Sequence, residues 1–279
     1  MRHNQIKSTL AATIALVIGV GGSVWGAEQS IILASTTSVE SSGLLERILP
    51  QFTARTGISV NVVAQGTGKA LDTARRGDAD LLLVHDPQAE QQFMNEGHAA
   101  TKRQIAWNDF IIVGPSGDPA RIRGGRDAVA GLKAIAAAQA PFVSRGDKSG
   151  TNAAELRLWK SAGYMPDAIN TKKWYRDIGG GMGQALNAAS AMDAYTLSDR
   201  GTWLSFNNKG SLVVAIEGDP GLINRYDVIE LSRDKHASAK LSPAKVFADW
   251  LVSAEGQQAI GAYQVNGQRL FNPSAGSEK

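Results

Sequence analysis

The sequence predicts an α/β protein built from two lobes, each a mostly parallel sheet covered by helices, with two crossover strands between the lobes. Three observations support this prediction. Short apolar runs alternate with segments of helical spacing along the chain, as in successive βαβ units. A turn-rich stretch at 114–118 separates an early block from a later one. The chain has 279 residues, which is near the size at which a single core divides into two.

The early block contains four predicted strands and three predicted helices. The strands are apolar runs at 31–34, 58–63, 80–84 and 110–113. The helices have apolar residues three and four apart and cover 44–52, 69–76 and 89–96. Because strands and helices alternate, we expect the strands to pair in parallel beneath the helices.

The later block repeats this alternation. It begins with a predicted helix at 128–138, a strand at 141–143 and a helix at 152–162. A glycine-rich turn at 179–183 then leads to a helix that ends at Met192, followed by a strand at 194–197 and a closing segment at 199–206. A strand at 212–216 is then predicted to return to the early block. We therefore assign residues 28–114 and 213–279 to the first lobe and 115–212 to the second, with the ligand expected in the cleft between them.

The last predicted helix begins with Ser242 as its N-cap and Pro243 at its first helical position. Its spacing predicts a buried face made of Val246, Phe247, Trp250 and Leu251. This helix is expected to cover the sheet of the first lobe.

Residues 1–27 have the pattern of a secretory signal peptide, and we expect cleavage near 26–27. Arg2 and Lys7 are basic, and the apolar run at 10–20 is followed by small residues. The run is shorter than the ~20 residues needed to span a bilayer. The chain has no cysteine, so a lipid anchor on cysteine and disulfides are excluded. We expect a periplasmic protein that is not a lipoprotein.

The charge and the residue types exclude several functional classes. The formal net charge is +3 and falls to about +1 without residues 1–27, and no run of like charges is present. Nucleic acid is therefore not an expected partner. Four scattered histidines and no cysteine suggest no metal site and no catalytic triad. We expect no enzyme activity, no catalytic residue and no cofactor; a secreted hydrolase or phosphatase is the less favoured alternative.

Three predicted strand-to-helix turns are rich in hydroxyl and backbone donors. They are Ser35-Thr36-Thr37-Ser38, Gln65-Gly66-Thr67-Gly68, and the loop from Ser144 to Thr151. In the first, Thr37 and Glu40 match a capping box. Each turn alone is equally compatible with an ordinary helix cap. Together they predict an anion site, because the carboxyl ends of parallel strands meet at one edge of a sheet.

The third turn also carries charge. Arg145 can direct two donors onto an oxyanion, and Ser149 and Thr151 can add hydroxyls. Asp147 would repel an anion unless it orients Arg145 or accepts a proton from the ligand. Two readings of Asp147 therefore remain open at this point.

The chain resembles the tungstate-binding proteins of ABC importers, the TupA family, within the type II periplasmic binding proteins. The resemblance runs from about Ile31 to Asn272 and is carried by STTS (35–38), GTGKAL (66–71), GDADLLLVHDP (77–87), NDFIIVGP (108–115), SRGDKSGT (144–151) and YTLSDRGTW (195–203). The family usually has T-T-T-S where this chain has Ser35, which keeps the hydroxyl. SRGDKSGT alone is also similar to a loop of phosphate-binding proteins, so a phosphate carrier is the alternative.

The resemblance implies two hinged lobes that close on one oxyanion, tungstate or molybdate, without a bound metal ion of the protein's own. It implies a membrane permease with its cytoplasmic ATPase as partners, and we expect a monomer. The ligand-binding residues it implies are Thr36, Thr37, Ser38, Thr67, Arg145, Ser149 and Thr151.

Five further polar positions are less specific. Four of them flank a predicted strand and are candidates for the wall of the second lobe: Asp193, Thr196, Asp199 and Arg200. The segment 199–202 is better explained by helix capping and a local ion pair. His85 ends a buried strand and is interpreted as a core or hinge histidine.

Overall fold

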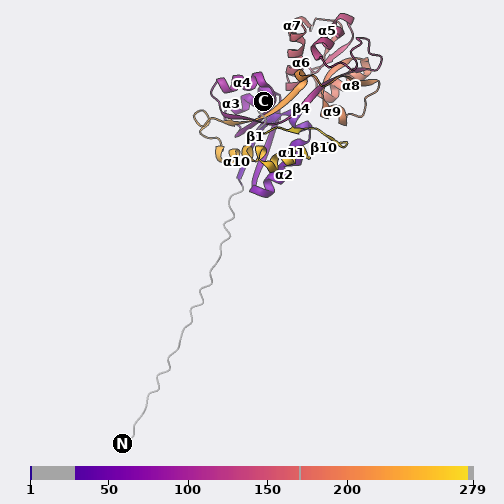
Figure 1. Ribbon diagram of the computed structural model, residues 1–279. Coiled ribbons are helices and arrows are strands. Elements are labelled where there is room, and N and C mark those ends of the chain that lie inside the picture. The colour runs from indigo at the N-terminus through magenta and orange to yellow at the C-terminus, as the bar shows by residue number, and fades with distance from the viewer. Residues whose placement is uncertain (2–28, 170, 276–279) are drawn as a thin grey trace.

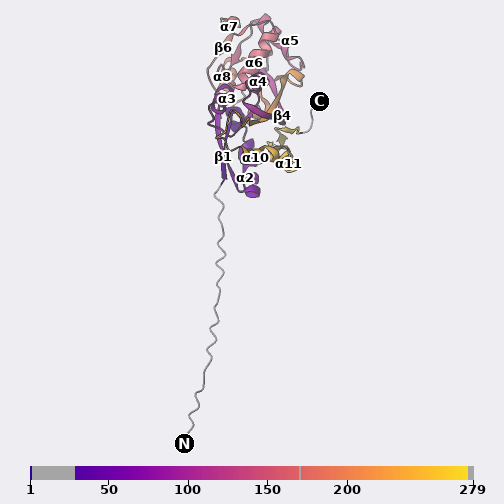
Figure 2. The same ribbon diagram turned by 90° about the vertical axis from the view of Figure 1, so that its left-hand side faces the viewer.

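The computed structural model describes residues 1, 29–169 and 171–275 of the chain. Apart from Met1, the predicted signal peptide lies outside the described residues. Figure 1 shows two lobes. One contains α2 (Leu44–Thr56), α3 (Thr67–Arg75), α4 (Pro87–Asn95), α10 (Leu241–Val252) and α11 (Ala254–Gly261), and the other contains the helices from α5 (Ala128–Ala138) to α9 (Arg200–Ser205). The view in Figure 2, turned by 90°, shows the lobes stacked along one axis. No helix in the described part of the chain is long and apolar enough to cross a membrane.

One sheet of ten strands runs through both lobes in the described residues, in the order β2-β1-β3-β9-β4-β7-β5-β6, with β8 and β12 also paired to β4. Its strands are β1 (Gln29–Thr36), β2 (Ile58–Gln65), β3 (Leu81–Val84), β4 (Ala99–Pro115), β5 (Phe142–Ser144), β6 (Tyr175–Asp177), β7 (Tyr195–Asp199), β8 (Leu212–Ile216), β9 (Ile223–Leu231) and β12 (Asn272–Pro273). A separate hairpin pairs β10 (Gln264–Val265) with β11 (Gln268–Arg269).

The two halves of the sheet are built alike. In the first, β1 pairs in parallel with β2 and β3. In the second, β5 pairs in parallel with β6 and β7. An antiparallel strand adjoins each trio, β9 beside β3 and β4 beside β7. The predicted α/β fold is confirmed, and two of the antiparallel strands, β4 and β9, connect the lobes.

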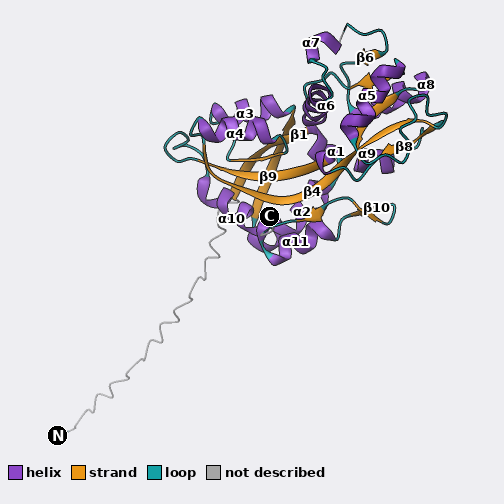
Figure 3. Ribbon diagram, turned by 45° about the horizontal axis from the view of Figure 1, so that its top comes forward, coloured by secondary structure: helices purple, strands orange, loops and turns teal. Residues whose placement is uncertain are grey.

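The long strand β4 belongs to both lobes. Its first part, from Ala99 to Asp109, pairs with β9, and its last part, from Phe110 to Pro115, pairs with β7 and β8. Figure 3 shows β4 and β9 running side by side between the lobes. The sequence predicted only residues 110–113 of this strand, because the polar alternation at 99–109 masks its first part. We refer to residues 29–109 and 223–275 as the first lobe and to 110–222 as the second.

Helices cover both faces of each half of the sheet. They are α1 (Thr37–Ser41), α2 (Leu44–Thr56), α3 (Thr67–Arg75), α4 (Pro87–Asn95), α5 (Ala128–Ala138), α6 (Gly150–Ser161), α7 (Pro166–Ile169), α8 (Met182–Met192), α9 (Arg200–Ser205), the 3₁₀ helix η1 (Pro220–Leu222), α10 (Leu241–Val252) and α11 (Ala254–Gly261). In the first lobe, α2, α10 and α11 pack on one face and α3 and α4 on the other. In the second, α5 and α6 oppose α8 and α9.

Two predictions are wrong: the point at which the chain returns to the first lobe, and the start of helix α10. Leu212–Ile216 pairs with the last part of β4, and Ala215 and Ile216 pack in the core of the second lobe, so the chain returns later than residue 213. Helix α10 begins two residues earlier than predicted, with Lys240 rather than Ser242 as its N-cap, and Val246 is exposed. The remaining predicted face, Phe247, Trp250 and Leu251, is buried.

Candidate functional site

The three hydroxyl-rich turns lie at the carboxyl ends of β1, β2 and β5, where they begin α1, α3 and α6. The second and third turns are in contact, since a Cβ placed on Gly66 would lie 3.7 Å from the carbonyl oxygen of Lys148. The first and third are joined through His85, whose Nε2 is 3.1 Å from Thr36 Oγ1 and whose ring packs against Gly150. The predicted convergence of these turns, which come from both lobes, is therefore confirmed.

Four of the seven buried side-chain atoms without a hydrogen-bond partner in the described residues lie in these turns. The side-chain atoms Ser38 Oγ, Thr67 Oγ1, Thr151 Oγ1 and Arg145 Nε are buried and have no hydrogen-bond partner in the described part of the protein. Buried donors almost always have a partner in folded proteins. Because each of the three turns supplies at least one such atom, the arrangement indicates a site for a ligand that accepts hydrogen bonds.

A pocket of about 280 Å³ opens beside these groups between the lobes. Its lining comes from both lobes and consists of Thr37, Ser38, Ser41, Arg145, Asp147, Gly181, Met182, Asp199 and Thr202. The volume lies just below the ~300–1,000 Å³ range of ordinary ligand pockets. Of the predicted residues, Thr37, Ser38 and Arg145 line this pocket. The others are buried and are not part of its lining; they are Thr36, Thr67, Ser149 and Thr151.

Arg145 is held in place by Asp147. The guanidinium Nη2 donates to Asp147 Oδ2 at 2.5 Å, and the other carboxylate oxygen, Oδ1, accepts from the backbone N–H of Ser149 at 3.1 Å. The Arg145 side chain is only 6% exposed. Of the two readings of Asp147, the structure shows the first: Asp147 orients the arginine. The Nε–H of Arg145 is left as a buried, charge-assisted donor.

The backbone of the third turn depends on a glycine. Gly146 has φ of +60°, and a Cβ there would overlap the carboxylate of Asp177 in β6. Lys148 also adopts a positive φ, and its N–H donates to Asn152 Oδ1 at 3.2 Å. Ser149 is the N-cap of α6, and its Oγ accepts from the N–H of Asn152 at 3.3 Å. The hydroxyl of Ser149 therefore serves the helix cap first.

The first turn differs from its prediction in one residue. Thr36, not Thr37, is the N-cap of α1, and its Oγ1 accepts from the N–H of Val39 at 3.2 Å. The capping box of Thr37 and Glu40 is therefore wrong. The one-residue shift leaves Thr37 and Ser38 facing the pocket, while the hydroxyl of Thr36 is engaged by the cap and by His85.

A buried acid beneath the third turn escaped the sequence analysis. Glu155 lies one turn after Thr151 in α6, and its carboxylate accepts from Ser144 Oγ at 2.6 Å and from the Tyr175 hydroxyl at 2.7 Å. Burial raises the pKa of Glu155 to about 7. The available signal was an acidic residue on a helix face that otherwise carries Leu158 and Trp159.

Comparison with known proteins agrees with this geometry. Residues 21–255 match the family model of the PBP superfamily domain. The chain is 43% identical over 253 residues to the tungstate-binding protein TupA of Peptoclostridium acidaminophilum, covering 89% of this chain and 87% of that one. It is 43% identical over 267 residues to a putative ABC transporter anion-binding protein of Haloferax volcanii, covering 93% of this chain and 77% of that one.

The chain belongs to the TupA family of periplasmic binding proteins. Its fold is similar to the solved structure of the tungstate-binding protein TupA from Desulfovibrio alaskensis G20, with a TM-score of 0.79, 39% identity, and coverage of 88% of this chain and 99% of that one. The three turns described above therefore belong to a fold whose relatives are binding proteins of ABC importers.

In this member of the TupA family, the other candidate polar residues have local roles. Thr196 is buried, and Asp193 ends α8 and accepts from Ser211 Oγ at 2.6 Å. Arg200 donates two hydrogen bonds to Asp109 of β4, at 2.8 and 2.6 Å, and a third to Glu217. Asp199 is the N-cap of α9, which confirms the capping interpretation of this segment, although the ion pair of Arg200 reaches across to β4 instead of being local.

Proposed function

We propose that this protein captures tungstate, or the similar molybdate, between its lobes and delivers it to the permease of an ABC importer. The observation that carries the proposal is the set of four buried, unpartnered donors contributed by three turns from both lobes. The TupA names of its relatives support the choice of ligand. The proposed contacts are Thr37, Ser38, Thr67, Arg145 and Thr151, with Thr36 and Ser149 holding the helix starts.

A site of this kind answers the main physical problem of binding a doubly charged anion. Moving such an ion out of water is costly unless its hydration shell is replaced by other donors. Hydroxyl groups, backbone N–H groups at helix starts and one guanidinium can replace that shell without introducing excess charge. Arg145 supplies the charge-assisted bond, and Asp147 keeps it in place.

The carboxylates near the pocket already accept hydrogen bonds from the protein, so they are weaker acceptors for a ligand proton, which favours tungstate over phosphate. Both carboxylate oxygens of Asp147 accept hydrogen bonds, and those of Asp199 accept from the N–H and hydroxyl of Thr202 at 2.7 and 2.9 Å. Phosphate keeps a proton near neutral pH and gains from a free acceptor, whereas tungstate has no proton to donate. A phosphate carrier remains the alternative, and a hydrolase is less favoured.

The two connecting strands support a hinge mechanism. We propose that β4 and β9 bend so that the second lobe closes over the anion, and that the permease recognises the closed form and opens it. We also propose that the protein is exported, cleaved near residues 26–27, and present in the periplasm without a lipid anchor. In this proposal it is a monomer that needs no cofactor, and a cytoplasmic ATPase acts with the permease.

Calorimetric titration of the mature protein with sodium tungstate, molybdate, sulfate and phosphate tests this proposal. We expect tight binding of tungstate and molybdate at one site, with phosphate much weaker. Tighter binding of phosphate would favour the alternative carrier. Turnover of a phosphate ester by the pure protein would favour the hydrolase.

A further inference from the structure

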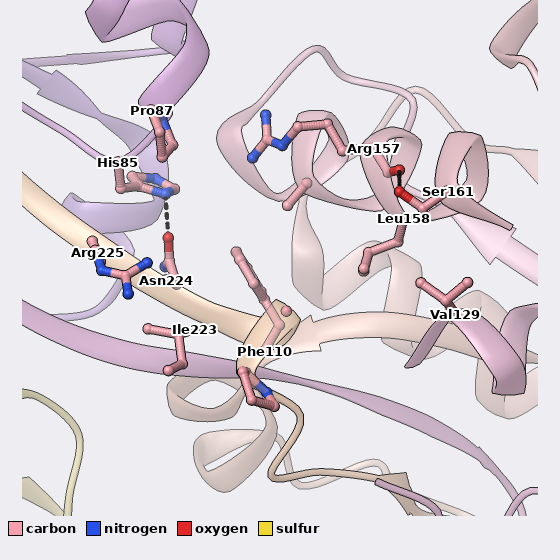
Figure 4. Close-up of a pocket in the computed structure, with 13 residues that line it drawn as sticks. His85, Pro87, Phe110, Val129, Arg157, Leu158, Ser161, Ile223, Asn224 and Arg225 are labelled. Carbon is pink, nitrogen blue, oxygen red and sulfur yellow. Dashed lines mark hydrogen bonds between the residues drawn. The ribbon is translucent and has the colours of Figure 1, made fainter. Parts of the chain in front are cut away.

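A buried histidine connects the hinge to the turns of both lobes. His85 follows β3, is only 2% exposed, and lies beside Asn224 of β9 (Figure 4). Its Nδ1 is 3.0 Å from Asn224 Oδ1. Its ring centroid is 5.0 Å from that of Tyr226, further along β9. Burial lowers the pKa of His85 to about 4, so the ring is neutral at physiological pH.

The hydrogen-bond network determines which nitrogen carries the proton. Asn224 Nδ2 donates to Asn108 Oδ1 at 2.9 Å and to the Tyr226 hydroxyl at 2.8 Å, so Asn224 presents its oxygen to His85. The Nδ1–H of His85 therefore donates to Asn224, and Nε2 is left as an acceptor. It follows that the hydroxyl of Thr36 donates to His85 Nε2.

This bond fixes the start of α1. The Thr36 hydroxyl gives its proton to His85 and accepts the N–H of Val39, so both of its functions are used inside the protein. The next two residues, Thr37 and Ser38, line the pocket. Their position therefore depends on a chain of bonds that ends on β4 and β9, the strands connecting the lobes.

The same imidazole contacts the second lobe. A Cβ placed on Gly150, the first residue of α6, would lie 2.5 Å from His85 Cε1 and 3.0 Å from each ring nitrogen. Gly150 lies between Ser149 and Thr151, in the turn that holds Arg145. The ring can therefore approach this turn only because residue 150 has no side chain.

We propose that His85 is a positioning residue for oxyanion binding, which ties the pocket side of α1 to the hinge strands and provides the surface against which the α6 turn of the second lobe closes. This inference rests on the proposed function. It assigns to His85 no contact with the anion, and it makes Gly150 the partner of His85 across the lobes.

A double-mutant cycle tests the contact between the lobes. We expect His85→Ala and Gly150→Ala each to weaken tungstate binding about tenfold, as measured by calorimetry on the mature protein, which corresponds to about 1.4 kcal/mol. In the double variant the added methyl meets no ring, so the combined loss should be well below the product of the single losses. Gly183→Ala in α8, where a Cβ meets nothing within 4 Å, is the matched control and should bind as wild type does.

Two conservative variants separate the two bonds of the ring. His85→Gln places an acceptor where Nε2 lies and should keep the bond from Thr36, whereas His85→Asn places a donor where Nδ1 lies and keeps only the bond to Asn224. Because the proposed tie needs both bonds, we expect each variant to recover only part of the affinity that His85→Ala loses. Full recovery by either variant would overturn the role of the bond that it lacks. Urea unfolding of each unliganded variant shows that it is folded, and these two variants still test the proposal if His85→Ala does not fold.

The outcomes distinguish this inference from the proposed function. If wild type binds tungstate and the His85 variants bind it equally well, only the positioning role is overturned. Multiplicative losses in the double variant overturn the contact between the lobes. Wild-type protein that binds none of the oxyanions overturns the proposed function and this inference with it.

Discussion

The two lobes have the same strand arrangement but contribute different chemistry to the pocket. Each places three parallel strands beside an antiparallel connecting strand, and in each the strand ends lead into helix starts. The first lobe contributes hydroxyls, those of Thr37, Ser38 and Thr67, and no charge. The second contributes the hydroxyl of Thr151 and also Arg145, whose positive charge is balanced by Asp147. The shared topology creates the place for an anion, and the side chains of each turn decide how it is held.

The turns also rest on different supports. Beneath the first lobe's turn lies a neutral network of His85, Asn224 and Asn108. Beneath the second lobe's turn lies the buried carboxyl of Glu155, held by Ser144 and Tyr175. Because one support is a base with a lowered pKa and the other an acid with a raised pKa, the lobes should respond to pH in opposite directions.

The largest effect should come from removing the charge of the second lobe. Arg145→Ala deletes a charge-assisted donor and leaves Asp147 without its cation beside the anion. We expect tungstate binding to weaken by about 3 kcal/mol, roughly a hundredfold in Kd. Arg176→Ala removes an exposed charge from the same lobe and is the control for calorimetry. Equal affinities of the two variants would contradict the role of Arg145.

The buried carboxyl of Glu155, which supports the turn of the second lobe, should respond to a rise in pH. The pKa of Glu155 is raised from 4.5 to about 7 in the folded protein, so its contribution to stability is fully present below pH 4.5 and is lost as the pH rises through 7. Glu155→Gln has no proton to lose. Urea unfolding from pH 4.5 to 8 should show wild type losing about 3 kcal/mol relative to this variant. Parallel pH profiles would show that Glu155 is not the buried acid described.

The support of the first lobe should respond to acid instead. The pKa of His85 is lowered from 6.5 to about 4, so its contribution is present above pH 6.5 and is lost as the pH falls through 4. Relative to His85→Gln, wild type should lose about 3 kcal/mol of unfolding free energy between pH 7 and 4. The same titration series measures this difference, and a slope of the opposite sign would refute it.

The hydroxyls should give the smallest effects, with a distinctive pattern. Thr67→Val and Thr151→Val each remove an unpartnered buried hydroxyl, so each should weaken tungstate binding by about 1 kcal/mol without lowering the stability of the unliganded protein. The control is Thr73→Val in α3, whose hydroxyl donates to Gln65 Oε1 at 3.2 Å. That variant should lose stability and keep its affinity. Loss of stability in the first two variants would contradict a ligand role for their hydroxyls.

Local patterns predicted most of the fold and the three turns. Apolar runs such as Leu81–Val84 and the cap at Asp199 have local causes, and the structure has them where the sequence suggested. The two N-caps predicted by name, Thr37 and Ser242, are displaced to Thr36 and Lys240. The return of the chain was misplaced because the apolar strand Leu212–Ile216 fits the core of either lobe, and only its pairing with β4 decides.

The supports of the site could not be predicted in the same way. His85 and Asn224 are 139 residues apart, and their hydrogen bond exists only because β3 and β9 are neighbours in the sheet. The engagement of Asp147 by Arg145 was one of two possibilities that depended on a turn geometry set by Gly146 and Lys148. Such contacts between distant or conformationally special residues leave no periodic signal in the sequence.

The most direct test of the central claim is a crystal structure of the mature protein with tungstate, with the tungsten located by its anomalous scattering. The account predicts one strong peak between the lobes, within hydrogen-bonding reach of Ser38, Thr67, Arg145 and Thr151 through the anion's oxygens. A peak elsewhere on the molecule, with these four side chains still unpartnered, would contradict it.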